Sequence, residues 1–296
     1  MAELQTVTKA VIPIQGLGTR FLPLSKAISK EFLPLGEKPM IHYLLEELSQ
    51  SGIKEVFFVV GAAKHPLVSY LQRARTLEKI LEERGQKEEL EGLTSLHELL
   101  ENFSFSFVVE SKIMGDGYAI LQAKKHVGDE PFLVAYPDDV IEAKTPCSLQ
   151  LMNVFRTSQR PVQGLVSLPQ ERLSAYGVID GNRIANRLWK VTSIVEKPPL
   201  GKAPSQLAIV GRRILTPDIF SYLRKTTANG KGEIVLTEAL GKMAKDGKPI
   251  YGYEIEGRWW ECGDKQGWLI SNAIFSLRDP KYGKMVREAV KQEKII

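Results

Sequence analysis

The 296-residue sequence contains only two cysteines, Cys147 and Cys262, which are far apart and lack metal-ligand spacing. A disulfide scaffold or a structural zinc site needs more cysteines, so we expect a protein of a reducing compartment. The sequence also lacks any run of roughly 18 apolar residues, the length of a membrane helix, and its first ten residues lack the apolar core of a signal peptide. These absences predict a cytoplasmic protein with no membrane partner.

The sequence also lacks a large excess of charged residues of either sign. The formal net charge is +5, the pI is near 9.0, and no arginine-rich run or zinc-finger spacing occurs. Nucleic-acid-binding proteins usually concentrate basic residues on one patch or run, so we predict no nucleic-acid partner and consider an anionic small ligand instead. With 43% hydrophobic and 25% charged residues, the composition is that of an ordinary globular protein.

Strand-like and helix-like patterns alternate along the first half of the chain. The runs "KAVIPI" and "EVFFVVG" predict buried strands, and between them "PMIHYLLEELSQSG" predicts a helix with one apolar face. This order continues to "PFLVAY" and predicts a Rossmann-like, mainly parallel α/β sheet flanked by helices. A charged helical stretch at 62–104 interrupts the order, and we interpret it as an insertion.

The second half contains more short strand-like runs, among them "GLVSLP", "GVID", "VTSIVEKP" and "LAIVGRRIL". No linker rich in Gly, Pro or Ser separates the two halves, and no internal repeat occurs. We therefore predict a single domain over 1–296, with one half at 1–145 and a more elaborate C-terminal half at 146–296.

Two glycines follow the first predicted strand in "QGLGTR". Ligands of parallel sheets bind beyond the carboxyl ends of the strands, so Gly16 and Gly18 stand where a turn could wrap phosphate oxygens. A dinucleotide fingerprint would need a third glycine at Phe21, and a Walker A loop would need a GK[ST] sequence, so neither is present. The basic residues beyond the loop, including Arg20 and Lys30, could neutralise a triphosphate. A tight turn with solvated cations is the alternative.

Two adjacent acids, Asp138 and Asp139, end another apolar run in "AYPDDV". Mg²⁺ prefers one or two carboxylates together with phosphate oxygens, so these residues are candidate ligands. Successive strand residues point in opposite directions, and at most one of the two is expected to face a metal. An acid pair that merely begins a turn is the alternative.

The glycine loop, the acid pair and several later runs together resemble one family. The segment "KAVIPIQGLGTRFLPLSKAISKEFLPLGEKPMIHYLLEEL" is followed in order by "YPDDV", "AYGVID", "VEKP", "VGRRIL", "GEIVLTEAL" and "WECGDKQGW". This set is similar to the bacterial UTP:glucose-1-phosphate uridylyltransferases (UDP-glucose pyrophosphorylases) of the sugar-nucleotidyltransferase superfamily, over nearly the whole chain.

The resemblance implies a nucleotidyltransferase-type fold with an extra β-rich part over the sugar site. It implies Mg²⁺-dependent transfer of a uridylyl group from UTP to glucose 1-phosphate, which gives UDP-glucose and pyrophosphate. It also implies homodimers or homotetramers, since family members commonly form them.

The resemblance further implies roles for individual residues. Arg20 would face the departing pyrophosphate, Lys30 would neutralise the phosphates in the transition state, and Asp138 would bind the metal. Nucleotide contacts are implied for Gln15, Gly16, Gly18, Thr19, Glu110 and Gly115. Contacts with the sugar phosphate are implied for Gly177, Glu196, Lys197 and Arg212.

Three positions depart from the family pattern. Gln15 stands where the family has a small residue, Glu110 aligns with its base-reading glutamine, and Glu261 replaces the second metal-binding aspartate in "WECG". An ionised Glu110 can only accept hydrogen bonds, which weakens the assignment of uracil unless Gln15 supplies a donor. UTP is the first choice. The departures leave two alternatives: another base or sugar 1-phosphate, and a weakly active or non-catalytic regulatory paralogue.

Overall fold

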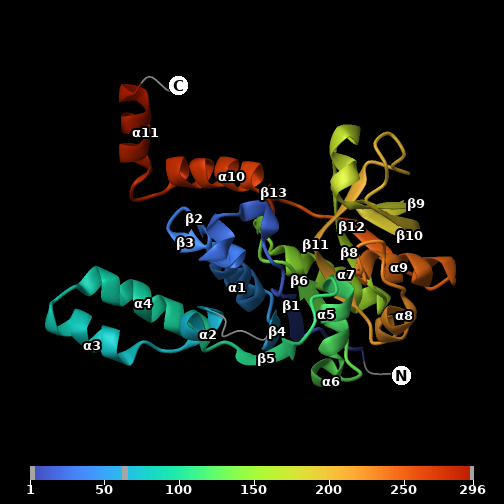
Figure 1. Cartoon of the computed structure of the whole chain (residues 1–296), viewed down its shortest axis with the longest axis horizontal. Coiled ribbons are helices and arrows are strands. Elements are labelled where there is room, and N and C mark those ends of the chain that lie inside the picture. The colour runs from blue at the N-terminus through green and yellow to red at the C-terminus, as the bar shows by residue number, and fades with distance from the viewer. Residues whose placement is uncertain (1–3, 62–65, 294–296) are drawn as a thin grey trace.

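The structure is a computed structural model that describes residues 4–61 and 66–293. Within these residues lies a nine-stranded sheet with the order β5-β4-β1-β6-β11-β8-β12-β10-β9 (Figure 1). Its strands are β1 (Lys9–Pro13), β4 (Glu55–Gly61), β5 (Ser104–Glu110), β6 (Phe132–Ala135), β8 (Val162–Ser167), β9 (Gly177–Ala185), β10 (Leu188–Glu196), β11 (Leu207–Leu215) and β12 (Tyr251–Glu254).

The sheet is mixed rather than mainly parallel, which corrects the expectation from the sequence. The strands β5, β4, β1 and β6 are parallel to one another, as the βαβ order predicted. In contrast, β11 is antiparallel to β6 and β8, and β9 is antiparallel to β10. The connection from Ala185 to Leu188 shows the reason: such a short turn can join only antiparallel strands, because a parallel crossover needs about a dozen residues or more.

Helices cover both faces of the sheet and bury two apolar cores. One core lies under α1 (Met40–Gln50) and α7 (Cys147–Ser158), and the other under α5 (Asp116–Gln122), α8 (Ile219–Lys225) and α9 (Leu236–Lys245). Alternating strand residues supply the two cores, with Val11 on one side and Ile12 on the other. All nine residues of β11 are buried because both of its faces are covered.

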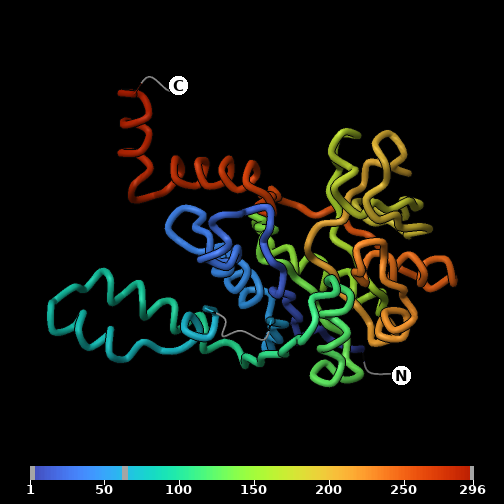
Figure 2. Tube along the Cα trace, in the orientation of Figure 1, coloured from blue at the N-terminus to red at the C-terminus, as the bar shows by residue number. Residues whose placement is uncertain are grey.

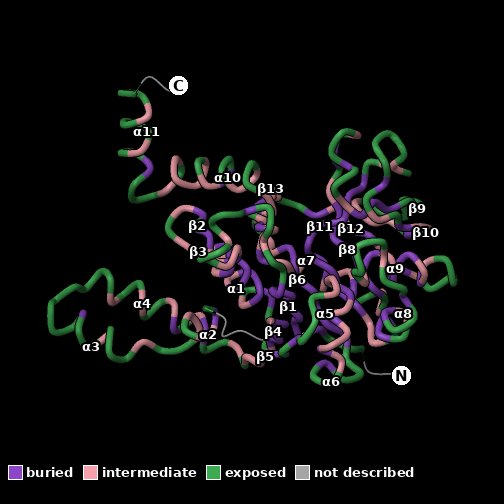
Figure 3. Tube along the Cα trace, viewed as in Figure 1, coloured by how far each residue is buried: buried purple, intermediate pink, exposed green. Residues whose placement is uncertain are grey.

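Two groups of helices project from this body on the same side (Figures 1 and 2). The expected helical insertion forms α2 (Pro66–Leu71), α3 (Arg75–Glu83) and α4 (Lys87–Leu100); residues 62–65 lie outside the described part. The C-terminal helices are α10 (Lys265–Arg278) and α11 (Gly283–Gln292), and much of both projections is exposed (Figure 3). An ion pair between Glu88 and Lys281 joins them.

The remaining elements are short. They are α6 (Lys124–Val127), the 3-10 helices η1 (Thr19–Phe21), η2 (Leu24–Lys26), η3 (Lys30–Phe32) and η4 (Gln170–Ala175), and the paired strands β2 (Pro34–Leu35) with β3 (Lys38–Pro39) and β7 (Asp139–Glu142) with β13 (Arg258–Glu261). Across the described residues, no helix has the length and apolarity that crossing a membrane requires.

Candidate active site

The segment after β1 folds into three consecutive 3-10 helices. Gly18 precedes η1 with a φ of 60°, a conformation that favours glycine. A Cβ at this position would lie only 3.0 Å from the Cβ of Ser25 and 3.9 Å from that of Lys30. The turn therefore brings the glycine loop against η3, while Gly16, Thr19 and Arg20 remain exposed beyond the carboxyl end of β1.

The centre of the site is an ion pair between Lys30 and Asp138, whose Nζ and Oδ2 atoms are 2.5 Å apart. Burial would lower the pKa of Lys30, but the charge and hydrogen bond of Asp138, with smaller contributions from Glu31 and Asp139, together outweigh this effect and the pKa is raised. Burial would likewise raise the pKa of Asp138, but Lys30, with a smaller contribution from Arg20, lowers it. Lys30 is therefore charged, Asp138 is ionised, and Arg20 lies close enough to act on the same carboxylate.

The second acid, Asp139, lies on the opposite side of the chain from Asp138. It accepts a hydrogen bond of 2.6 Å from Nε1 of Trp259, and Gly211 is so close that a Cβ there would lie 2.2 Å from Oδ2. Burial, and then the neighbouring Asp138, raise the pKa of Asp139 to about 7. The alternation expected from the sequence is thus observed, and only Asp138 faces Lys30.

Glu261 is directly opposite Asp139 in the antiparallel β7–β13 ladder. Paired residues of such a ladder share one face, so Glu261 lies on the side of Asp139. Its carboxylate accepts a hydrogen bond of 2.5 Å from Arg172 and another from the hydroxyl of Tyr176. In this structure its oxygens are held by those two side chains rather than directed at Asp138.

A divalent cation fits the side of Asp138. The carboxylate is ionised and partly exposed, and Gly263 leaves space beside it because it has no Cβ, which would lie in tight contact, 3.3 Å from Oδ2. Among the described residues, no cluster of three or more His, Cys, Asp or Glu side chains could enclose a metal. Such a site suits an ion that takes one carboxylate from the protein and its other ligands from substrate phosphates.

A second group of predicted residues lies where β1 and β5 end, on the side of β6 away from β11. Glu110 ends β5 and is only 2% exposed, and in the described part of the chain no well-formed hydrogen bond reaches either of its carboxylate oxygens. Burial raises its pKa to about 7, and the Met114 amide opposes this shift only in part. Gln15, just beyond β1, is also buried, and none of the described residues donates a hydrogen bond to its Oε1. Both residues therefore have unused hydrogen-bonding capacity where β1 and β5 end.

Gly115 fixes the start of α5 beside Glu110. Its φ is 91°, and a Cβ would lie 2.7 Å from the carbonyl oxygen of Ile234. Asp116 continues this contact by accepting hydrogen bonds from the amide of Leu236 and the hydroxyl of Tyr136. The start of α5 is thereby attached to the start of α9, which borders the third group of predicted residues.

That third group is formed where β9 begins and β10 ends. Gly177 pairs with Glu196, and a Cβ at Gly177 would lie 3.3 Å from Oε2 of Glu196 and 2.8 Å from the methyl group of Thr237. Lys197 is exposed, lies 3.2 Å from Glu196 and has a φ of 45°, which is unusual for a residue with a side chain. Gly177, Glu196 and Lys197 are thus brought together as expected.

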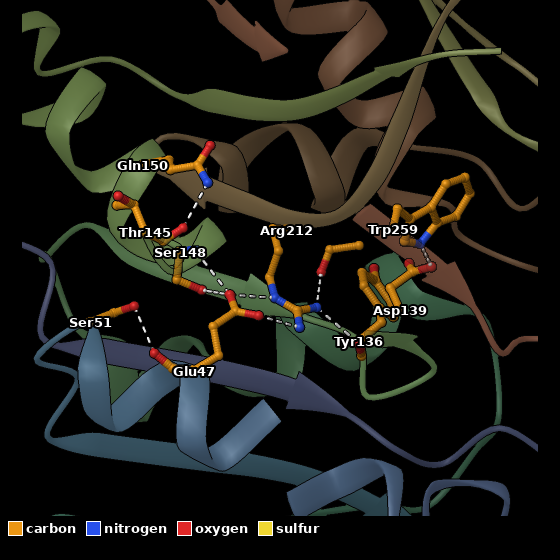
Figure 4. A network of polar contacts seen from close by, with 10 residues as sticks. Glu47, Ser51, Tyr136, Asp139, Thr145, Ser148, Gln150, Arg212 and Trp259 are labelled. Carbon is orange, nitrogen blue, oxygen red and sulfur yellow. Dashed lines mark hydrogen bonds and ion pairs between the residues drawn. The ribbon is translucent and has the colours of Figure 1, made fainter. Parts of the chain in front are cut away.

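Arg212 does not join that group, and its guanidinium instead points toward Glu47 (Figure 4). Its side chain is 1% exposed, and it donates two hydrogen bonds of 2.9 Å to the carboxylate of Glu47. Its Nη1 donates to the carbonyl oxygens of Tyr136 and Gly211. Ser148 also donates to Glu47, from both its amide and its hydroxyl. With these donors engaged in the interior, Arg212 does not contact a sugar phosphate in this arrangement, in contrast to the expectation from the resemblance.

Four residues near the third group were not predicted from the sequence. Only one signal pointed to any of them, the two consecutive arginines in the otherwise apolar run "LAIVGRRIL". The others became candidates only through contacts between segments distant in sequence. The four are Asp116, Tyr136, Arg213 and Thr237.

The fold and the site define a nucleotidyl transferase: the chain belongs to the nucleotidyl transferase family, whose model matches residues 9–274. A protein named UTP--glucose-1-phosphate uridylyltransferase from Staphylococcus haemolyticus is 39% identical over 278 residues, which cover 94% of this chain and 95% of that protein. A protein of the same name from Bacillus subtilis is 37% identical over 276 residues, 93% of each chain.

Solved structures show the same similarity. A UDP-glucose pyrophosphorylase complexed with UDP-glucose is 32% identical, with a TM-score of 0.83, over 92% of this chain and 99% of that one. A UTP-bound enzyme from Acinetobacter baumannii is 32% identical, with a TM-score of 0.85, over 96% of this chain and 98% of that one.

Proposed function

We propose that this chain transfers the uridylyl group of UTP to glucose 1-phosphate, forming UDP-glucose and releasing pyrophosphate. The names of the relatives and the ligands of the similar structures support this choice of substrates. The observation that carries the proposal is the ion pair of Lys30 with Asp138, which places a cation and an ionised carboxylate beside the glycine loop.

In this reaction a phosphate oxygen of glucose 1-phosphate attacks the α-phosphorus of UTP, and the bond from that phosphorus to the β-phosphate oxygen breaks. No covalent enzyme intermediate is needed, so the protein contributes positioning and charge neutralisation. Lys30 neutralises the α-phosphoryl group during transfer, and Arg20 neutralises the leaving pyrophosphate. The backbone of Gly16 and Gly18 lies against the triphosphate.

Asp138 is the residue that would hold a divalent cation, which we take to be Mg²⁺. Bound there, the cation would balance charge on the phosphate oxygens as the transfer proceeds. Because Asp138 also pairs with Lys30, the same carboxylate would hold both positive charges near the reacting phosphoryl group. Glu261 is held by Arg172 and Tyr176, so we assign it to the structure of the loop around the metal rather than to the metal itself.

The substrates extend to either side of this centre. Glu110, Gln15 and Gly115 contact the base at the ends of β5 and β1. Lys197 binds the phosphate of glucose 1-phosphate, and Glu196 accepts hydrogen bonds from the sugar hydroxyls beside Gly177. The order of the sheet supports this arrangement, because β6, which precedes Asp138, lies between β1 and β5 on one side and β9 and β10 on the other.

The experiment measures pyrophosphate release from the purified chain with Mg²⁺, four nucleoside triphosphates and several sugar 1-phosphates, and identifies each nucleotide sugar by mass spectrometry. The highest kcat/KM is expected for UTP with glucose 1-phosphate. A faster reaction with another base or sugar would move the assignment to that substrate. Release from no combination would favour the non-catalytic paralogue.

We also infer that the chain self-associates, as a homodimer or a homotetramer, through its projecting helices. These helices expose large apolar side chains that a monomer would leave in water: Leu77, Leu269, Ile270, Tyr282 and Met285. Light scattering coupled to size-exclusion chromatography measures the assembly directly, and a monomeric mass at micromolar concentration would contradict it. A cytoplasmic location agrees with the two buried, free cysteines.

A further inference from the structure

Two consecutive arginines on β11 have opposite environments. Arg212 points to the face covered by α1 and α7, where it pairs with Glu47. Arg213 points to the face covered by α5 and α9, because successive strand residues alternate. Arg213 is only 8% exposed, and its Nη1 donates a hydrogen bond of 3.0 Å to the hydroxyl of Thr237.

Arg213 lacks the compensation that Arg212 has. Among the residues that the structure describes, its buried Nε atom has no hydrogen-bond partner, and no carboxylate forms an ion pair with it. A buried charge with an unused donor is unfavourable, and buried polar groups in native proteins nearly always have partners. The natural partner of such a donor in a binding site is an acceptor on the ligand.

The surroundings of Arg213 identify which ligand that would be. Thr237, to which it donates, contacts the position of Gly177, and Gly177 pairs with Glu196. Arg213 and Glu196 also both act electrostatically on the hydroxyl of Tyr136, although burial is the main reason that its pKa is raised well above 10. Arg213 therefore lies beside the residues to which we assign the sugar.

We propose that Arg213 is a specificity-determining residue for the sugar, and that its Nε donates a hydrogen bond to one hydroxyl of the hexose 1-phosphate. This inference rests on the proposed function. Glu196 can only accept hydrogen bonds when ionised, and Arg213 can only donate them. A sugar hydroxyl does both, so the two side chains can read hydroxyls in complementary ways. The preferred substrate is a hexose 1-phosphate that carries a free hydroxyl at the position facing Arg213.

A purely structural role is the competing explanation. Gln163 on β8 is directly opposite Arg213 on β11 and fully buried, and no residue that the structure describes forms a hydrogen bond with either of its amide atoms. A small rotation of both side chains could let Oε1 of Gln163 accept from Arg213. In that case Arg213 would stabilise the sheet and would not distinguish one sugar hydroxyl from another.

The test compares glucose 1-phosphate with its 2-, 3-, 4- and 6-deoxy analogues, with UTP, in wild type and in Arg213→Met. A site that hydrogen-bonds a hydroxyl strongly rejects the analogue that lacks it, so the wild type should lose about 10²-fold or more in kcat/KM with the analogue that lacks the hydroxyl facing Arg213. Arg213→Met should reduce the discrimination against that same analogue to about 3-fold or less, because the donor that would be left unpaired has been removed. Discrimination among the other three should not change.

An equal loss for glucose 1-phosphate and all four analogues in Arg213→Met would overturn the inference in favour of the structural role. So would a wild type that accepts all five substrates equally. Arg183→Met is the matched control, since Arg183 is exposed near the far end of β9 and should keep the wild-type pattern. If circular dichroism shows that Arg213→Met does not fold, Arg213→Lys replaces it in the same comparison. Lysine keeps the positive charge, but its shorter side chain has no donor at the position of the Arg213 Nε.

The proposed function can fail separately. A wild type that forms no UDP-glucose would contradict the proposed function. The role of Arg213 would then be tested by binding alone, with calorimetric titration of the same five sugar phosphates into wild type and Arg213→Met. A single analogue whose weaker binding disappears in Arg213→Met would still support the inference, and equal binding throughout would reject it.

Discussion

The guanidinium of Arg212 and the carboxylate of Glu47 form two parallel hydrogen bonds of 2.9 Å in the interior, across 165 residues of sequence. Through the same guanidinium, Arg212 holds the carbonyl oxygens of Tyr136 and Gly211. Tyr136 lies two residues before Asp138, so this pair connects the core to the strand end that carries the acid of the site.

Removing one member of this pair should destabilise the protein strongly. Glu47→Ala leaves the Arg212 charge buried and unpaired, and we expect the free energy of unfolding to fall by about 3–5 kcal/mol in urea titrations. Replacing both residues, as Glu47→Leu with Arg212→Met, should restore much of the loss because no charge is then left unpaired. Lys79→Ala, which breaks an exposed pair at 3.8 Å, should cost under about 1 kcal/mol.

Lys30→Met should lower kcat by about 10²-fold to 10³-fold, because it removes one charge that stabilises the transferring phosphoryl group. The substitution keeps most of the unbranched side chain and removes only the charged end, and steady-state rates of pyrophosphate release measure the effect. Lys54→Met serves as the control because Lys54 is exposed just before β4, at the opposite edge of the sheet. Equal rates for Lys30→Met and wild type would remove Lys30 from the transition state.

Glu110 should make both stability and the KM for UTP depend on pH. Burial raises its pKa from 4.5 to about 7, so the folded state binds the proton more tightly than the unfolded state. Its contribution to stability is therefore greatest at low pH and falls as the pH rises from about 4.5 to about 7. Glu110→Gln should remove this dependence and be relatively more stable at pH 8.

The same proton should affect base recognition. A neutral carboxylic acid has one donor and one acceptor, as an amide has, whereas the ionised form can only accept. We expect the KM for UTP to rise above pH 7 in the wild type but not in Glu110→Gln. UTP titrates equally in both assays, so comparing the wild type with Glu110→Gln cancels its effect. The control is Glu101→Gln, on the surface after α4, which should follow the wild type. Parallel pH profiles for all three proteins would show that Glu110 does not contact the base.

Gly211→Ala should disturb the acid pair through a steric effect. The new Cβ would lie 2.2 Å from Oδ2 of Asp139, so the β7 turn must shift, at a cost of about 1–3 kcal/mol in unfolding free energy. Gly92→Ala is a matched control, because Gly92 is within α4 and a Cβ there meets no atom within 4 Å. Alanine favours helix, so this control should gain about 0.5–1 kcal/mol. Similar stability changes in both variants would contradict the packing around Gly211.

Lys197 combines a proposed phosphate contact with a strained backbone, and two substitutions separate these features. Lys197→Ala and Lys197→Gly both remove the cation and should raise the KM for glucose 1-phosphate by similar factors. Only glycine relieves the φ of 45°, so Lys197→Gly should be about 1 kcal/mol more stable than Lys197→Ala. An unchanged KM in both variants would show that Lys197 does not bind the sugar phosphate.

Most elements could be predicted from the sequence because their patterns are local. The run around Val11 forms β1, the repeat of Leu44 and Leu48 forms α1, and the run of acids and leucines after residue 65 forms three helices. The mixed character of the sheet could not be predicted, because a strand run such as "LAIVGRRIL" has the same composition whether its neighbours are parallel or antiparallel.

The sequence by itself determined the strands and helices, the glycine loop and the identity of the charged residues, since each depends on neighbours within a few positions. Tertiary structure alone decided how those charges are used. Lys30 meets Asp138 across 108 residues, Glu261 turns to Arg172 rather than to Asp138, and two adjacent arginines face opposite cores, one paired and one not. The physical reason is that the energy of a charge depends on burial and on partners only a few ångströms away, and the chain brings those partners from segments distant in sequence.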